Sequence, residues 1–322
     1  MPDAFPAPLT FGQILAPMTE EAFFADVLGQ KVVHVEGPDD RFQFAMNWDI
    51  LTALLNQTGI WTPASLQLHL GGGHVNAADY AMPGMTRVGQ PGEVVDLDKV
   101  RHWIRQGASI VLNEIHTLTP GLKAISKVMS DTLGGKARCN LYCSWREKQA
   151  FDVHFDTHDA YVLQIAGEKR WRIYQRTISD PVNHPDFRTL GQAFHEKNRG
   201  PLSAEFVVKP GDLVYLPRGF YHEALAQSDA TMHVTFGVVP VIGLDLITAV
   251  YERAVHDELF RKAIPYADGD WKKTEQHIQR LAKRFADLVR DRDFQRRFGA
   301  SMRDFRTPAQ NIKLPDDAFP KK

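Results

Sequence analysis

Three observations predict a mainly β fold with helical regions before and after it. Between Lys136 and Val239, short runs rich in β-branched and aromatic residues alternate with turns. Helical patterns are concentrated before about residue 135 and after Pro240. The chain of 322 residues is long enough for one large domain and an appended region. The strand spacing is typical of a β-sandwich or a β-barrel.

The composition is that of an ordinary globular protein. Hydrophobic residues make up 43% of the chain, and 38 Lys and Arg against 39 Asp and Glu leave a net charge of -1, so the global basic signature of a nucleic-acid binder is missing. Two cysteines, Cys139 and Cys143, are too few for a disulfide framework or a structural zinc site. We expect no signal peptide and no membrane span, and the cytoplasm is the expected compartment.

The first 135 residues predict short helices alternating with strands. Apolar spacing indicates helices at 20–28, 48–55, 96–106 and 119–133. Strands are indicated at 32–37, 65–70 and 109–115. We expect these elements to flank and position the β core.

The β core is predicted to contain seven strands, at 137–145, 160–166, 169–174, 205–208, 212–217, 222–226 and 232–239. Ala166-Gly167-Glu168 predicts a hairpin turn between the second and third of these strands. In the third strand, Lys169, Trp171 and Ile173 share one face and the arginines share the other. A lysine that points inward among apolar neighbours needs a counter-charge.

Two stretches carry residues suited to bind one metal ion. His154 and Asp156 are two residues apart on an extended segment, so both side chains leave the same face. The second stretch, 209–222, predicts a turn, a strand, a tight turn and then His222. Two histidines and one carboxylate leave other coordination positions open, as in non-haem Fe(II) oxygenases.

The second stretch has a spacing that is expected of a jelly-roll metal site. Gly211-Asp212 is followed by Pro217, Gly219 and His222, which fill every fixed position of the pattern. With the His-x-Asp pair upstream, the chain resembles the JmjC-type cupins, the Fe(II)- and 2-oxoglutarate-dependent oxygenases that include the ribosomal-protein hydroxylases. The resemblance implies a double-stranded β-helix, or jelly-roll, at 136–240. It forms a catalytic domain, 1–240, together with the flanking elements at 1–135.

The resemblance also implies roles for five residues. His154, Asp156 and His222 are expected to hold Fe(II), with 2-oxoglutarate and O2 as cosubstrates. Lys169, 15 positions after the first histidine, is expected to meet the distal carboxylate of 2-oxoglutarate, and Tyr142, 12 positions before it, to assist. Without the resemblance, Lys169 snorkelling to solvent and Tyr142 packing in the core stay open as alternatives.

Four further residues near these stretches bear on the site. Thr235 is expected to offer an inward hydroxyl to the cosubstrate. His158 has the strand parity of the metal pair, but its position is not a ligand in the family, so it is expected beside the ligands or facing substrate. The role of His233 stays open. Phe151 stands where another member of the family, the asparaginyl hydroxylase of the hypoxia pathway, has a cosubstrate-binding threonine, which favours the arrangement with Tyr142.

The activity that the resemblance implies is hydroxylation of a side chain in a protein or peptide, with succinate and CO2 as co-products. A ribosomal protein is one expected substrate class, and a smaller peptide product is another. Demethylation of N-methyl-lysine is an alternative outcome of the same chemistry. A non-catalytic metal-binding cupin that acts as a sensor or scaffold is the alternative that is not an enzyme.

The C-terminal region, 241–322, is predicted to be helical. Apolar residues share one face in 244–260 and again in 276–298, which predicts two amphipathic helices followed by an extended tail. In the ribosomal-protein hydroxylases such helices form dimers, so a homodimer is expected here. We expect no winged-helix domain after them.

Overall fold

The computed structural model describes residues 9–57, 59–86, 88–145, 152–265 and 271–305. The chain divides into two compact units, of which the first ends at Val239 and the second begins at Pro240. The expected tail lies outside the described residues. Within the described ranges, no helix is both long and apolar enough to cross a membrane.

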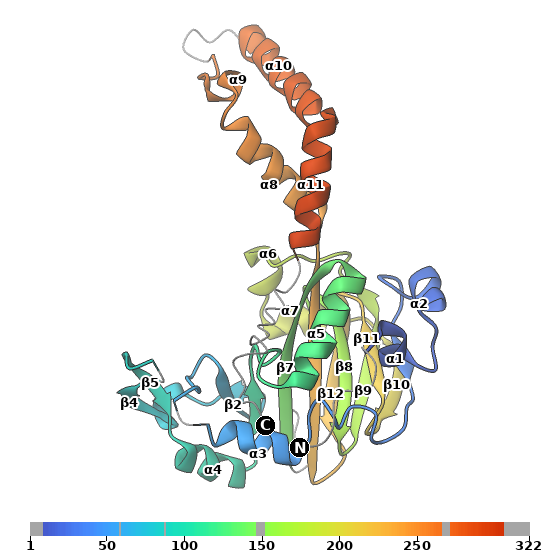
Figure 1. Ribbon diagram of the computed structural model, residues 1–322, viewed down its shortest axis with the longest axis vertical. Coiled ribbons are helices and arrows are strands. Elements are labelled where there is room, and N and C mark those ends of the chain that lie inside the picture. Colours follow the sequence, from blue (N-terminus) through green and yellow to red (C-terminus); the bar gives the residue numbers. More distant parts are fainter. Residues whose placement is uncertain (1–8, 58, 87, 146–151, 266–270, 306–322) are drawn as a thin grey trace, which may run out of the picture. The chain divides into compact units, whose positions relative to one another are not determined.

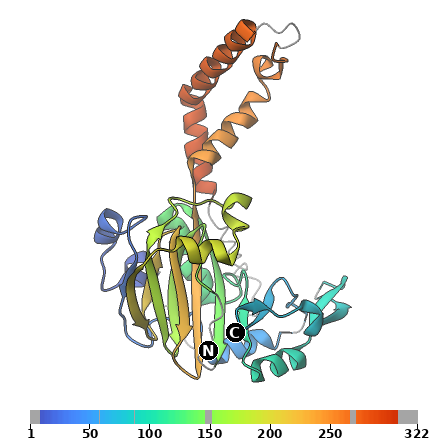
Figure 2. The ribbon, with the colours of Figure 1, turned by 180° about the vertical axis from the view of Figure 1, so that it is seen from behind.

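Two sheets form the core of the first unit (Figures 1 and 2), as the predicted mainly β class requires. The larger sheet has the strand order β1 (Val33–Val35), β11 (Leu213–Leu216), β8 (Asp159–Ala166), β13 (Ala230–Pro240), β7 (Gly135–Trp145), β6 (Ser109–Leu112), β2 (Leu66–Leu70) and β3 (Gly73–His74). The smaller sheet has the order β10 (Leu202–Val208), β9 (Lys169–Thr177) and β12 (Phe220–Ala226), and a separate pair joins β4 (Ala81–Met85) to β5 (Pro91–Val95). All seven predicted core strands are present.

The predicted hairpin between β8 and β9 is wrong. β8 pairs with β11 and β13 in the larger sheet, whereas β9 pairs with β10 and β12 in the smaller one. The turn at Gly167 therefore carries the chain from one sheet to the other. Sequence spacing cannot distinguish a hairpin within one sheet from a turn between two sheets, because a tight turn with a glycine at positive φ occurs in both.

Strand β8 of the larger sheet is buried on both faces. Tyr161, Leu163 and Ile165 of β8 belong to the main core cluster, which includes the N-terminal helices. Ala160 and Val162 of the same strand pack instead with residues of the smaller sheet. The space between the sheets is therefore lined by alternate residues of β8.

The N-terminal helices are α1 (Phe11–Leu15), α2 (Glu20–Asp26), α3 (Trp48–Leu55), a 3-10 turn η1 (Ala77–Asp79), α4 (Leu97–Arg105) and α5 (Pro120–Leu133). The helices predicted at 48–55, 96–106 and 119–133 are confirmed. Thr119 caps α5 by accepting a hydrogen bond from the Leu122 amide, and Gly134 ends the helix in the left-handed region.

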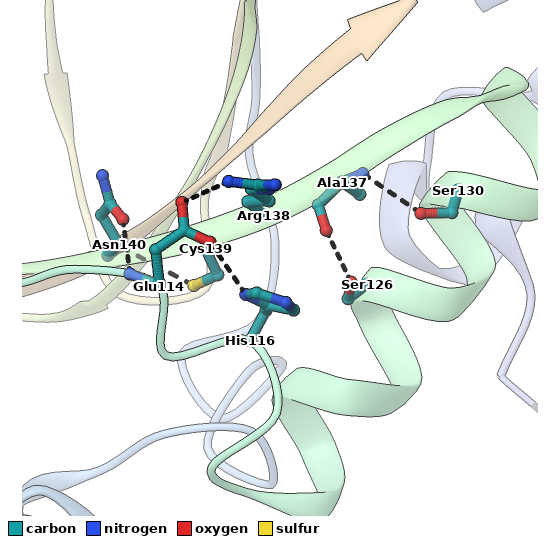
Figure 3. A network of polar contacts seen from close by, with 8 residues as sticks. All are labelled: Glu114, His116, Ser126, Ser130, Ala137, Arg138, Cys139 and Asn140. Carbon is teal, nitrogen blue, oxygen red and sulfur yellow. Dashed lines mark hydrogen bonds and ion pairs between the residues drawn. The ribbon is translucent and has the colours of Figure 1, made fainter. Parts of the chain in front are cut away.

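Polar contacts fasten α5 to β7 (Figure 3). The Ser126 hydroxyl donates to the Ala137 carbonyl at 2.7 Å, and the Ala137 amide donates to the Ser130 hydroxyl at 3.1 Å. Nearby, Arg138 of β7 forms an ion pair with Glu114 at 3.2 Å. These contacts fix the start of the strand that carries Tyr142.

Two short helices, α6 (Pro185–Arg188) and α7 (Gln192–Asn198), lie in the connection from β9 to β10. The Gln192 side chain donates to the Val153 carbonyl, and Phe155 makes an edge contact with the His195 ring at 5.4 Å. α7 therefore packs against the segment that carries His154.

The second unit is helical as expected, but both predicted helices are interrupted. The predicted helix 244–260 is two helices, α8 (Gly243–Ala254) and α9 (Glu258–Arg261), because the Asp257 side chain caps α9. The predicted helix 276–298 is α10 (Trp271–Arg290) and α11 (Arg292–Asp304), separated by the capping residue Asp291. The apolar periodicity of a helix continues across Asp257 and Asp291, so it did not indicate that each predicted helix is interrupted there.

Candidate metal centre and active-site cavity

A cavity of about 520 Å³ has residues of both sheets in its wall. All six candidate residues that the sequence singles out line it, which are Tyr142, His154, Asp156, Lys169, His222 and Thr235. They come from β7, β9, β12, β13 and the segment before β8. The fold thus gathers residues that are far apart in the sequence around one space.

The three candidate metal ligands lie at one place in the cavity wall. One ligand atom from each of His154, Asp156 and His222 falls within 4.8 Å of the others. The two histidine rings are 4.6 Å apart, and Nε2 of His222 lies 3.9 Å from Oδ2 of Asp156. Two imidazoles and a carboxylate in this arrangement suit a first-row divalent metal with open positions.

Backbone hydrogen bonds hold the ligand-bearing segments together. The His154 amide donates to the His222 carbonyl at 3.1 Å, and the His222 amide donates to the His154 carbonyl at 2.8 Å. The Gly219 amide donates to the Asp156 carbonyl at 2.9 Å. At Gly219, φ is +86° and an added Cβ would lie 1.8 Å from the Ile178 carbonyl oxygen, so the turn before His222 requires glycine.

Main-chain carbonyls also orient the two histidine rings. Nδ1 of His154 lies 2.7 Å from the Asp152 carbonyl, and Nδ1 of His222 lies 2.9 Å from the Phe220 carbonyl. A carbonyl can only accept, so each neutral ring carries its proton on Nδ1 and presents the Nε2 lone pair. This is the tautomer that a metal ion binds through Nε2.

The charges of the ligands fit a divalent cation. Burial raises the pKa of Asp156, but the nearby His158, His222 and His154 together lower it by more than burial raises it. The pKa of Asp156 therefore lies below its usual value. Burial and the neighbouring His154 lower the pKa of His222 to about 4. At neutral pH the site therefore offers an ionised carboxylate and a neutral imidazole, which are the protonation states that coordinate metals.

Lys169 lies elsewhere in the same cavity wall and is only 3% exposed. It shares the inward face of β9 with Trp171 and Ile173, both buried, as the sequence predicts. Burial lowers the pKa of its ammonium to about 8, with a small opposing effect from the Cys143 thiol. Among the residues that the structure describes, no carboxylate forms an ion pair with it.

Three more residues complete the wall near Lys169. Tyr142 stacks on His233 with ring centroids 4.9 Å apart and an interplanar angle of 12°. Burial, and next the Asp156 carboxylate, raise the pKa of Tyr142 to about 12, so its hydroxyl stays protonated. Thr235, two residues after His233 on β13, also lines the cavity.

Of the remaining candidates, His158 lies outside the cavity wall. His158 packs over Gly237, where an added Cβ would come within 2.5 Å of its ring, and it is not part of the cavity wall. Its effect on the site is electrostatic, through the pKa of Asp156. Phe151 lies outside the described residues.

Sequence reasoning gave no role to Trp171 and Arg188, which line the cavity. The Trp171 ring stacks on His222 at 5.8 Å, and its buried Nε1 has no hydrogen-bond partner in the described chain. Arg188 comes from α6, where Nη1 donates to the Asn183 side chain at 3.0 Å. The only sequence feature that could have indicated a role for Arg188 was the long connection between the strands β9 and β10.

Comparison with known families identifies the region that contains this cavity. Residues 111–245 match the family model described as the JmjC domain. This region is a JmjC domain. It includes β7 to β13, so all the candidate ligands, Lys169 and Tyr142 lie within it. The resemblance that the motifs indicated is confirmed.

Curated proteins are similar to parts of this chain. One is "Bifunctional lysine-specific demethylase and histidyl-hydroxylase NO66" of Drosophila persimilis, 33% identical over 165 residues, or 45% of this chain and 23% of the relative. Another is "Ribosomal oxygenase 1" of Rattus norvegicus, 26% identical over 259 residues, or 80% of this chain and 39% of the relative. The chain thus spans well under half the length of both.

Solved structures have the same fold as this chain. The Escherichia coli ribosomal oxygenase YcfD, in complex with cobalt and 2-oxoglutarate, has a TM-score of 0.58 at 15% identity. The likeness covers 93% of this chain and 74% of YcfD. The likeness in fold therefore extends beyond residues 111–245.

Proposed function

We propose that this protein is an Fe(II)- and 2-oxoglutarate-dependent oxygenase that hydroxylates a side chain of a protein or peptide. His154, Asp156 and His222 would hold the iron, as the convergence of their ligand atoms within 4.8 Å supports. Lys169 would hold the distal carboxylate of 2-oxoglutarate. Tyr142 and Thr235 would line the cosubstrate's position.

The observation that carries this proposal is the state of Lys169. Burying an ammonium without a partner costs several kcal/mol or lowers its pKa, and here the pKa falls to about 8. A dicarboxylate in the cavity would supply the missing counter-charge. A metal site alone fits many proteins. A metal site with a buried lysine that has no carboxylate partner among the described residues of the same cavity fits a cosubstrate with a keto acid end and a distal carboxylate.

Each residue would act through binding, orientation or charge. When bound, Fe(II) with 2-oxoglutarate and O2 supplies the oxidant that converts a C–H bond to C–OH, with succinate and CO2 as co-products. The Nδ1–H groups of His154 and His222 stay on main-chain carbonyls, which keeps both rings aimed at the ion. Trp171 covers one face of His222 and limits the access of water to that ligand.

The proposed substrate is a protein side chain, and ribosomal proteins are the first candidates. The support is the naming of relatives as ribosomal oxygenases and as a histidyl-hydroxylase. Arg188 at the cavity is a residue through which a substrate can be selected, since it comes from the connection between β9 and β10 and not from the metal-binding core.

The test begins without a known substrate. Purified protein reconstituted anaerobically with Fe(II) is expected to bind 2-oxoglutarate and, on exposure to O2, to release succinate slowly. Extracts of the host with and without the gene are then compared by mass spectrometry. Peptides that gain one oxygen atom support hydroxylation, whereas loss of a methyl group from lysine supports the demethylase alternative. A protein that binds the metal but neither binds nor consumes 2-oxoglutarate would be a non-catalytic cupin.

We further propose that the second unit joins two copies of the chain. α8 and its C-cap residue Val255 carry an exposed apolar stripe. Its four residues, Leu244, Ile247, Tyr251 and Val255, are between 43% and 63% exposed. Their spacing of three and four residues places them on one side of the helix. The apolar core described within this unit has only four buried residues, which is small for an independent helical region. A second copy packed on the stripe would bury it.

Replacing Ile247 by glutamate is expected to separate the proposed dimer. A charge in the middle of a buried apolar stripe costs several kcal/mol in each copy, which is enough to shift association by orders of magnitude. Light scattering after size-exclusion chromatography measures the mass, and Glu252→Gln, an exposed change on the same helix, is the control. A wild-type protein that is monomeric at high concentration would contradict the proposal.

A further inference from the structure

His233 is a buried polar residue of the cavity to which the motifs assign no role. It lies on β13, lines the cavity and is only 5% exposed. Its Nδ1 atom is buried and has no hydrogen-bond partner in the described part of the chain. A buried nitrogen without a partner costs about 1–3 kcal/mol, so its presence here needs an explanation.

Aromatic rings fix the position of His233. One face stacks on Tyr142 at 4.9 Å, and Trp171 meets it edge-on at 6.1 Å. Trp171 in turn stacks on the candidate ligand His222. The imidazole is therefore held in one plane before any ligand arrives, which reduces the entropy cost of a hydrogen bond to that ligand.

The charge of His233 is set by its surroundings. Burial, and next the nearby Lys169 ammonium, lower its pKa well below the usual value, so the ring is neutral. A neutral imidazole still carries one N–H donor. Besides Trp171 Nε1, the cavity wall thus contains two buried groups that lack an acceptor in the described chain, the Lys169 ammonium and the His233 Nδ1 atom.

One ligand group can satisfy both residues. A carboxylate has two oxygens that together accept about four hydrogen bonds, and it is the group that a cation and a neutral donor can share. We propose that His233 donates a hydrogen bond to the distal carboxylate of 2-oxoglutarate, alongside Lys169, and thereby helps the cavity to select a dicarboxylate. This rests on the proposed function, since it assigns a second contact to the same cosubstrate.

Two substitutions test whether His233 acts as a hydrogen-bond donor or only as a packing residue. His233→Leu removes both ring nitrogens but keeps an apolar side chain of moderate size. His233→Asn keeps an N–H donor about where Nδ1 stands. Binding is measured by calorimetry with Mn(II) in place of iron and without O2, so that no turnover occurs. The titrants are 2-oxoglutarate and 2-oxobutyrate, which has the same keto acid end but lacks the distal carboxylate.

The expected result is selective. His233→Leu weakens 2-oxoglutarate binding by about tenfold to a hundredfold, which corresponds to a lost hydrogen bond to a charged group. The same variant leaves the weaker binding of 2-oxobutyrate unchanged, and His233→Asn restores most of the affinity for 2-oxoglutarate. Unfolding temperatures of the ligand-free proteins show that both variants are folded.

Three outcomes would overturn the assignment. Equal losses for both ligands would mean that His233 only supports the shape of the cavity. An asparagine variant as weak as the leucine variant would mean that the donor is irrelevant, and unchanged affinity in both would remove the contact altogether. If the wild-type protein with Mn(II) binds no 2-oxoglutarate, the proposed function itself fails, which is a different result from a failure confined to His233.

Discussion

Asp156→Ala is expected to abolish metal binding and, with it, all succinate release. The substitution removes the only carboxylate among the three convergent groups and leaves the two imidazoles. Loss of an outer hydrogen-bond partner weakens a metal site by about tenfold to a hundredfold, and loss of a ligand should exceed that range. Calorimetric titration with Mn(II), and succinate measured with Fe(II), check the two effects separately.

His158→Asn is the matched control for this prediction. His158 is two residues beyond Asp156, shares its strand parity and lies outside the cavity wall. Without His158 the pKa of Asp156 loses one of the effects that lower it, but a carboxyl group still ionises well below pH 7. The variant should therefore keep the wild-type metal affinity. A loss of metal affinity as large as that of Asp156→Ala would mean that the residues assigned as metal ligands are wrong.

Lys169→Met is expected to have two opposite effects. It should abolish measurable binding of 2-oxoglutarate, because the cavity loses the lysine proposed to hold the distal carboxylate. It should also stabilise the ligand-free protein, because methionine fills similar space without the cost of burying an ammonium. The fall of the pKa from 10.5 to about 8 corresponds to a cost on the order of 3 kcal/mol. Calorimetry and chemical unfolding measure the two effects.

The pH dependence tests the same residue. Between about pH 8 and 10.5 the unfolded chain keeps the Lys169 proton and the folded protein does not, so the stability of the ligand-free protein should rise with pH in this window. Affinity for 2-oxoglutarate should fall over the same range as the ammonium is lost. The methionine variant should lack the rise that comes from this lysine, whereas Lys99→Met, at an exposed lysine of α4, should keep it. An unchanged profile in Lys169→Met would mean that the lysine reaches solvent.

The sequence predicts the strands and the pattern of metal ligands because these depend on local spacing, whereas the roles of Lys169 and Tyr142 were indicated by the family resemblance. His154 and Asp156 share a face through strand parity, and Gly219 precedes His222 in a turn that only glycine permits. The inward direction of Lys169 followed from the alternation of β9. Each of these inferences needs only residues a few positions apart.

The remaining features depend on contacts between distant segments. β8 is buried on both faces, which no alternation reveals, and the chain leaves its sheet at Gly167 where a hairpin was equally consistent with the residues. The partners of His233 come from β7 and β9, so its isolation from acceptors became visible only in the folded structure. Arg188 reaches the cavity from a connection whose path the sequence does not encode in any short pattern.

The backbone bridge between His154 and His222 distinguishes this centre from sites that an ion assembles. In a zinc finger the metal brings the ligands together, and the chain unfolds when the metal leaves. Here two main-chain hydrogen bonds set the spacing of the two histidines, and carbonyls set their ring orientations. On the proposed function, the backbone would already hold both histidines in place when the ion arrives, so the supply of metal would govern activity more than folding.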